Sequence, residues 1–241
     1  ELKKVHSEID LVMTPNGSLV GMVHMNNCSS DVNAWVNIFD EFARAAGLQL
    51  DKNKIFNLLF NEALKGDPDG GGLLSYGYYS GENITHMSEG RPLFVRQPDS
   101  QFTLANFMRV HLFSAFGAMK IGMDILTKDE QINIDSIVGH GGIFKTEKVG
   151  QQVMSAVMNA PVTVMDTAGE GGAWGIALLA AYLREKENEQ SLADFLETKV
   201  FKDERGSTIA PLQEDVAGFE VFMERYQKGL PIEQAAIDYL R

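Results

Sequence analysis

The sequence has little cysteine, little positive charge and no long apolar run. Its one cysteine, Cys28, excludes a disulfide framework within the chain and fits a reducing compartment such as the cytoplasm. No apolar run is long enough to span a membrane, and the first residues show no signal-peptide pattern. Lysine and arginine total 21 against 33 aspartate and glutamate residues, so the net charge is −12. Such a surface repels nucleic acid, and we expect a cytoplasmic protein that binds neither nucleic acid nor membranes.

The chain also lacks an initiating methionine, and we expect it to begin inside a longer polypeptide. Its 241 residues suffice for a large domain, and 44% of them are apolar, so a hydrophobic core is expected. No internal repeat or low-complexity tract divides the chain. We therefore predict a single domain over residues 1–241. The acidic charge does not exclude a small anionic ligand such as ATP, because backbone N–H groups at a helix N-terminus bind phosphate.

Helical and extended patterns alternate along the chain, which is typical of an α/β protein. The predicted helices span residues 31–47, 52–64, 102–126, 145–158, 169–182, 191–199, 215–227 and 232–240. The predicted strands span residues 19–26, 134–138 and 161–165, and a short strand begins at residue 73. The apolar run at 9–13 is too short to assign. In the first helix, the spacing places Trp35, Ile38, Phe39, Phe42 and Ala46 on one face.

The sharpest local feature is the glycine turn Gly139–Gly142, which follows a predicted strand and leads into a predicted helix. Glycines let a ligand approach the backbone closely, and the following helix directs free N–H groups toward it. The spacing matches neither the Rossmann fingerprint nor a Walker A loop. Taken alone, the turn is equally compatible with a tight connection that binds nothing.

Two further segments are candidates for a ligand site. Residues 167–177 form a helix start rich in small residues, which suits a flat ligand or close helix packing. Residues 74–83 contain three tyrosines, which suit the cover of a cleft or an ordinary surface loop. Glu82 and Glu170 are candidate general bases without an evident partner. The five histidines show no spacing typical of metal ligands, so we predict no metal site in this chain.

The order of these segments resembles the C-terminal domain of the FGGY family of carbohydrate kinases. The matching positions are Ser29–Trp35, Ser80–Glu82, Thr103, Ala105, Arg109, Gly141–Lys145, Glu170, Ala173, Gly175 and Ala177. The chain departs from the family pattern at Asn83, Phe102 and Leu104, and at Trp174 within the small-residue helix. No single motif is decisive, but several in the family's order are specific. The departures bear on the identity of the sugar more than on the family.

The resemblance implies an RNase H-like fold, as in the actin-like ATPases, with a mixed central sheet flanked by helices. In the family, ATP and sugar lie in the cleft between two such domains, and the second domain supplies much of the adenosine site. Carried over, Gly141, Gly142 and Ile143 lie along the adenine and ribose, with Lys145 at the rim. The implied nucleotide-binding set is Gly139, Gly141, Gly142, Ile143, Lys145, Ser30 and Asn33.

The resemblance also implies the chemistry, which is in-line transfer of the γ-phosphoryl group of Mg²⁺-ATP to a sugar hydroxyl, with an Asp as base. Neither the family's catalytic Asp motif nor its phosphate loop occurs in this sequence. Both are expected in an N-terminal sugar- and phosphate-binding domain outside this chain. We therefore expect no catalytic residue here and an inactive fragment. The implied substrate is a pentulose, xylulose first, and a homodimer is possible through this domain.

Two alternatives stay open at the level of sequence. A domain of the same fold can serve as a sugar- or nucleotide-sensing regulator without catalysis. An unrelated α/β domain could match the motifs by chance, and in that case the small-residue helix would pack far from the glycine turn. A phosphate loop and an Asp motif upstream in the gene would favour the kinase.

Overall fold

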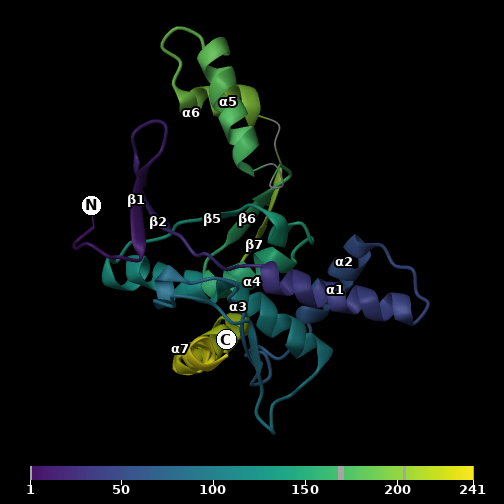
Figure 1. Ribbon diagram of the computed structural model, residues 1–241. Coiled ribbons are helices and arrows are strands. Elements are labelled where there is room, and N and C mark those ends of the chain that lie inside the picture. Colours follow the sequence, from purple (N-terminus) through teal and green to yellow (C-terminus); the bar gives the residue numbers. More distant parts are fainter. Residues whose placement is uncertain (1, 168–170, 203–204, 241) are drawn as a thin grey trace.

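The computed structural model describes residues 2–167, 171–202 and 205–240 (Figure 1). Its helices are α1 (Ser30–Ala45), α2 (Lys52–Ala63), α3 (Leu104–Asp124), α4 (Val149–Met158), α5 (Gly171–Glu185), α6 (Leu192–Phe195) and α7 (Gln213–Tyr239). Its strands are β1 (Ile9–Met13), β2 (Leu19–Val23), β3 (Leu74–Tyr76), β4 (Leu93–Val95), β5 (Ile137–Gly139), β6 (Val162–Met165) and β7 (Gly206–Ile209). The predicted mixture of helices and strands is confirmed. The sequence analysis did not predict strands β4 and β7.

The strands of the described residues lie in three separate sheets. Strands β1 and β2 form an antiparallel hairpin, and β3 pairs with β4 in the same sense. The third sheet has the order β5-β6-β7, with β6 parallel to β5 and antiparallel to β7. The resemblance implied one central sheet. Over residues 2–167, 171–202 and 205–240, the hairpin and the three-stranded sheet do not pair with each other, and each has free edges.

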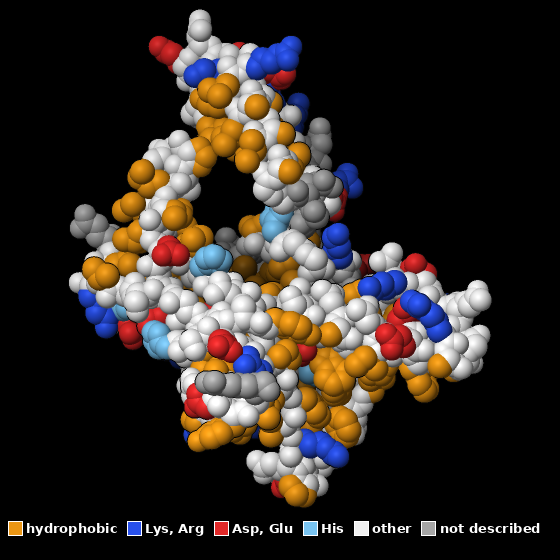
Figure 2. Space-filling view, in the orientation of Figure 1, with side chains coloured by type: hydrophobic (Ala, Val, Ile, Leu, Met, Phe, Trp, Pro, Cys, Tyr) orange, Lys and Arg blue, Asp and Glu red, His pale blue; other side chains and the backbone are white. Residues whose placement is uncertain are grey.

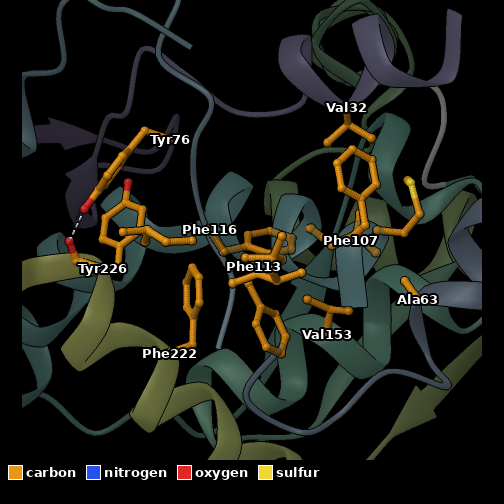
Figure 3. Close-up of a cluster of buried hydrophobic side chains, with 14 of the residues drawn as sticks. Val32, Ala63, Tyr76, Phe107, Phe113, Phe116, Val153, Phe222 and Tyr226 are labelled. Carbon is orange, nitrogen blue, oxygen red and sulfur yellow. Dashed lines mark hydrogen bonds between the residues drawn. The ribbon is translucent and has the colours of Figure 1, made fainter. Parts of the chain in front are cut away.

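Helix α3 is the centre of the hydrophobic core. Its residues from Asn106 to Ala118 are all buried, and α1, α2, α4, α7 and β3 pack around it. The ring of Phe113 meets the ring of Phe219 edge to face, with 5.0 Å between the centroids. Figure 3 shows Tyr76 donating a hydrogen bond to the backbone carbonyl of Tyr226 beside Phe222. This contact ties β3 to α7 at one end of the core.

The C-terminal helix is longer than the sequence predicts. Residues 213–239 form one helix, although the sequence predicts two helices interrupted near Pro231. A proline inside a helix removes one N–H donor and costs about 3 kcal/mol. The helix is buried on both sides of the proline, at Phe222 and Tyr226 before it and at Ala236 and Ile237 after it. This burial holds the helix together across Pro231. Tertiary packing therefore outweighs the local preference.

The apolar face predicted for the first helix is right only in part, since Trp35 and Phe39 are half-buried and their rings contact the ring of Phe107. The side chains of Ile38 and Phe42 are 52% and 70% exposed. Helix α1 instead buries Val32, Val36 and Ala43. These positions recur at helical spacing, and the inward face is centred on these smaller side chains, with Trp35 and Phe39 packed against the core beside them.

Two parts of the molecule project from this core (Figure 1). One is the β1–β2 hairpin. The other contains α5 and α6, which contact each other through the rings of Tyr182 and Phe195. Helix α5 buries none of its residues. Among the described residues, no helix is both long and apolar enough to cross a membrane.

Candidate functional site

A pocket of about 450 Å³ lies between α1, α2 and the turn that precedes α4. It is lined by Ser29, Val32, Asn33, Asn53, Phe56, Asn57, Phe60, Gly142, Ile143, Lys145 and Thr146. Pockets that hold small molecules are typically of this size and are mostly apolar, with a few polar groups that fix orientation. Four residues of the predicted nucleotide set line it: Asn33, Gly142, Ile143 and Lys145. The structure therefore brings together two segments that are far apart in the sequence.

Gly142 gives the pocket a bare wall. A Cβ atom added to Gly142 would meet no heavy atom within 4 Å, and the residue is exposed. Any larger side chain would therefore extend into free space beside the turn. A ligand can approach the backbone here as the sequence interpretation requires.

The other three residues of the predicted set do not line the pocket. Gly139 is buried, and a Cβ atom there would lie 2.7 Å from the ring of Phe144, so this glycine makes room for that side chain. Gly141 has a φ of 101°, which favours glycine and shapes the turn. Ser30 begins α1, and its neighbour Ser29 lines the pocket instead.

Helix α2 supplies a wall that the sequence analysis did not predict. Asn53 and Asn57 are four residues apart, as are Phe56 and Phe60, so each pair lies along one side of the helix. Asp51 caps this helix by accepting from the backbone N–H of Asn53 (3.0 Å). The available signal was the pair of phenylalanines at helical spacing, Phe56 and Phe60.

A hydrogen bond joins this wall to the glycine turn. The hydroxyl of Thr146 donates to the side-chain oxygen of Asn57 over 3.1 Å, and Thr146 is buried. With its oxygen engaged, the Asn57 amide presents its N–H groups, which have no hydrogen bond to the part of the chain that the structure describes. This amide can therefore donate to a ligand in the pocket.

Glu82 is an anchor rather than a general base. Its carboxylate is fully buried and accepts from the backbone N–H groups of Asn26 (2.9 Å) and Asn27 (3.1 Å). The side-chain oxygen of Asn27 in turn accepts from the backbone N–H of Tyr79 (2.9 Å). These bonds hold the segment that leads into α1, and so position the α1 wall of the pocket. The other candidate base, Glu170, lies outside the described residues.

The pocket itself carries little charge, because Lys145 is the one charged residue that lines it among those that the structure describes. His140, within the glycine turn, does not line it. Burial raises the pKa of the Cys28 thiol, which keeps this cysteine protonated and unreactive at neutral pH. Among the described residues, no group of three or more histidine, cysteine, aspartate or glutamate side chains is placed to hold a metal ion.

The chain is similar in fold to several sugar kinases. A xylulose kinase from Lactobacillus acidophilus superposes with a TM-score of 0.67 at 14% identity, over 96% of this chain and 43% of that protein. A xylulose kinase from Rhodospirillum rubrum gives 0.65 at 18% identity, over 95% and 44%. A gluconate kinase from Lactobacillus acidophilus gives 0.59 at 18% identity, over 90% and 40%. This chain therefore spans less than half the length of each of these proteins.

A search of curated protein sequences found no match. Residues 1–184, in contrast, match the sequence profile of the C-terminal domain of the FGGY family of carbohydrate kinases. The structural similarity confirms the predicted fold class, since the domains of these kinases have the actin-like ATPase fold. The order of motifs in the sequence, the fold and the profile agree. This chain therefore belongs to the FGGY family of carbohydrate kinases, as a C-terminal domain.

Proposed function

We propose that the chain is the nucleotide-binding half of an ATP-dependent sugar kinase, and that the pocket between α1, α2 and the glycine turn takes the adenosine part of ATP. The observation that supports this most is the place of Gly142, whose missing side chain leaves the backbone open to the pocket.

The lining suits a purine nucleoside. The rings of Phe56 and Phe60 offer apolar surface for a flat base, and the amides of Asn53 and Asn57 offer hydrogen bonds to its edge. Asparagine amides are well matched to the edge of adenine, where a donor and an acceptor lie side by side. Lys145 at the rim adds the positive charge that phosphate groups attract.

The transfer step needs groups from a second, complementing half. The sugar hydroxyl oxygen attacks the γ-phosphorus, the bond to the bridging oxygen of ADP breaks, and an Asp of the other half takes the hydroxyl proton. Mg²⁺ would neutralise charge on the phosphates. In this scheme the present chain binds and orients the nucleotide, which accounts for the expected inactivity of the chain alone.

We further propose that the sugar is a pentulose, with xylulose first. The names of two structurally similar proteins, both xylulose kinases, support this choice. A gluconate kinase is also among the similar structures. A test with the complemented enzyme should therefore compare xylulose, ribulose and gluconate as phosphoryl acceptors.

The first test is a calorimetric titration of the 241-residue chain with ADP. The Gly142→Val variant places a branched side chain beside the turn, and we expect it to bind ADP at least about ten-fold more weakly than the native chain. Gly175→Val is the matched control, because a Cβ atom at Gly175 also meets nothing within 4 Å but lies in α5, away from the pocket. Equal binding by both variants, or no binding of millimolar ADP by the native chain, would refute the proposal.

A further inference from the structure

The two asparagine side chains that α2 contributes to the pocket differ in how firmly they are held. Asn53 and Asn57 both line the pocket, and both are exposed. The side-chain oxygen of Asn57 accepts from the hydroxyl of Thr146 over 3.1 Å, and Thr146 is buried. Asn53 donates its backbone N–H to Asp51, but its side chain has no hydrogen bond within residues 2–167, 171–202 and 205–240. The pocket therefore has one amide of fixed orientation and one that can turn.

The fixed amide presents hydrogen-bond donors to the pocket. A primary amide has an oxygen that accepts and an NH₂ group that donates, so an amide whose oxygen is already engaged offers its NH₂ group to a ligand. At Asn57 that group has no hydrogen bond to the described residues. A carboxylate would offer acceptors alone, but no aspartate or glutamate of the described part of the chain lines this pocket. Asn57 therefore favours a ligand atom with a lone pair over one that carries a hydrogen.

The proposed placement of the nucleoside determines which edge of the base meets α2. In that placement the ribose lies beside Gly142, and the phosphates extend toward Lys145 at the rim. A purine is joined to its ribose through N9 of the five-membered ring, so its six-membered ring points away from the turn. Phe56 and Phe60, whose ring centroids lie 5.7 Å apart, give that ring apolar surface on α2. The edge that bears N1 and the substituent at C6 therefore reaches the α2 amides.

We propose that Asn57, oriented by Thr146, makes this pocket select adenine over guanine. The NH₂ group of Asn57 donates to N1 of adenine, and the amide oxygen of Asn53 accepts from the 6-amino group. In guanine, N1 carries a hydrogen, so the NH₂ group of Asn57 would face another donor, and such an unmatched pair weakens binding. Asn53 can turn its NH₂ group toward the 6-oxygen of guanine, so it discriminates less. The inference rests on the proposed function, because it names the base that the same pocket takes.

Charge on the surface around the pocket gives no such selectivity. Figure 2 shows basic and acidic side chains interspersed over the α1–α2 end of the molecule. Lys145 attracts the phosphates of either nucleotide, since ADP and GDP carry the same charge. The difference between the two bases lies at the edge that forms hydrogen bonds. Selectivity therefore comes from the amides, with Asn57 as the specificity-determining residue and Thr146 as a positioning residue.

The test is calorimetric titration of the 241-residue chain with ADP and with GDP. We expect the native chain to bind ADP at least about ten-fold more tightly than GDP. Asn57→Asp keeps the acceptor for Thr146 but replaces the donors with an acceptor, so it should lower this ratio of affinities at least about ten-fold. Asn53→Asp is the matched control, because it adds the same charge one helical turn away and still accepts from the 6-amino group of adenine. This control should retain the preference for ADP. An unchanged ratio in Asn57→Asp, or an equal loss of the ratio in both variants, would overturn the inference.

The positioning role of Thr146 is tested by the same ratio, since a merely structural role would weaken the binding of both nucleotides alike. Thr146→Val removes the hydroxyl and leaves the Asn57 amide able to turn its oxygen toward N1 of guanine. The ratio of ADP affinity to GDP affinity should therefore fall at least about three-fold. Thr146→Ser keeps the hydroxyl and should keep the ratio. If Thr146→Val weakens the binding of ADP and of GDP equally, the inference is wrong.

The two nucleotides also separate this inference from the proposed function. ADP binding that Gly142→Val weakens, together with equally tight binding of GDP by the native chain, would overturn the inference and leave the proposed function intact. Binding of neither nucleotide at millimolar concentration would refute the proposed function, and the inference with it. A preference for ADP that Asn57→Asp and Thr146→Val lose, and that the two control variants keep, would establish the inference.

Discussion

Glu233 in α7 should make the stability of the domain depend on pH in a direction unusual for a carboxylate. Its side chain is fully buried, and one of its oxygens accepts from the backbone N–H of Arg91 over 2.7 Å. The other oxygen has no hydrogen-bond partner in the part of the chain that the structure describes. Burial raises the pKa of Glu233 from 4.5 to about 7, and the contacts with Arg91 offset only part of this rise.

The sign and size of the effect follow from linkage between protonation and folding. Because the folded state holds the proton more tightly, the protonated carboxyl favours folding below the unfolded pKa, and this contribution is lost as pH rises through about 7. The difference between the two pKa values corresponds to about 3 kcal/mol. Between about pH 5 and about pH 8, roughly 2 kcal/mol of this should be lost.

The substitution that isolates this effect is Glu233→Gln, which keeps the shape and the acceptor for Arg91 but cannot ionise. We expect the free energy of unfolding of the native chain, measured with urea, to fall by roughly 2 kcal/mol relative to this variant between about pH 5 and about pH 8. Glu224→Gln, on the exposed side of the same helix, is the control and should show no such trend. A constant difference between native chain and Glu233→Gln across this range would refute the reasoning.

Three further predictions concern stability and the pocket. Glu82→Ala leaves the buried N–H donors of the segment before α1 without an acceptor, and it should lower the free energy of unfolding by about 3 kcal/mol or more. Glu82→Gln keeps one acceptor oxygen and should lower it less. Equal free energies of unfolding for the two variants would contradict the role of Glu82 as an anchor. Gly218→Ala places a Cβ atom 2.2 Å from the Pro68 backbone and should lower the free energy of unfolding by about 2 kcal/mol. Gly175→Ala adds its Cβ atom in open space and should leave the free energy of unfolding unchanged or raise it in the same urea assay. Thr146→Val removes the hydrogen bond to the side-chain amide of Asn57 in α2. It should weaken ADP binding a few-fold, measured by calorimetry, without changing the urea midpoint of unfolding. An unchanged affinity for ADP would exclude a role of Thr146 in positioning Asn57.

Local patterns in the sequence predicted most of the helices, because helical periodicity and turn residues depend on neighbours a few positions apart. The apolar face of the first helix was predicted correctly only in part, for a related reason. Several inward faces are possible for an amphipathic helix, and contact with α3 selects the one that buries Val32 and Val36. Likewise, Pro231 ends a helix by local rules, yet packing on both sides of it keeps α7 continuous.

The sequence by itself determined the family, the glycine turn and the expectation that Gly142 faces a nucleotide, because these reside in short motifs and their order. Only the tertiary structure decided what stands opposite that turn. Asn57 and Thr146 are 89 positions apart, so no local pattern could indicate that their side chains meet. The role of Glu82 as an anchor, and the free edges of β1–β2 and β5, are likewise decided by contacts made or left open between distant segments.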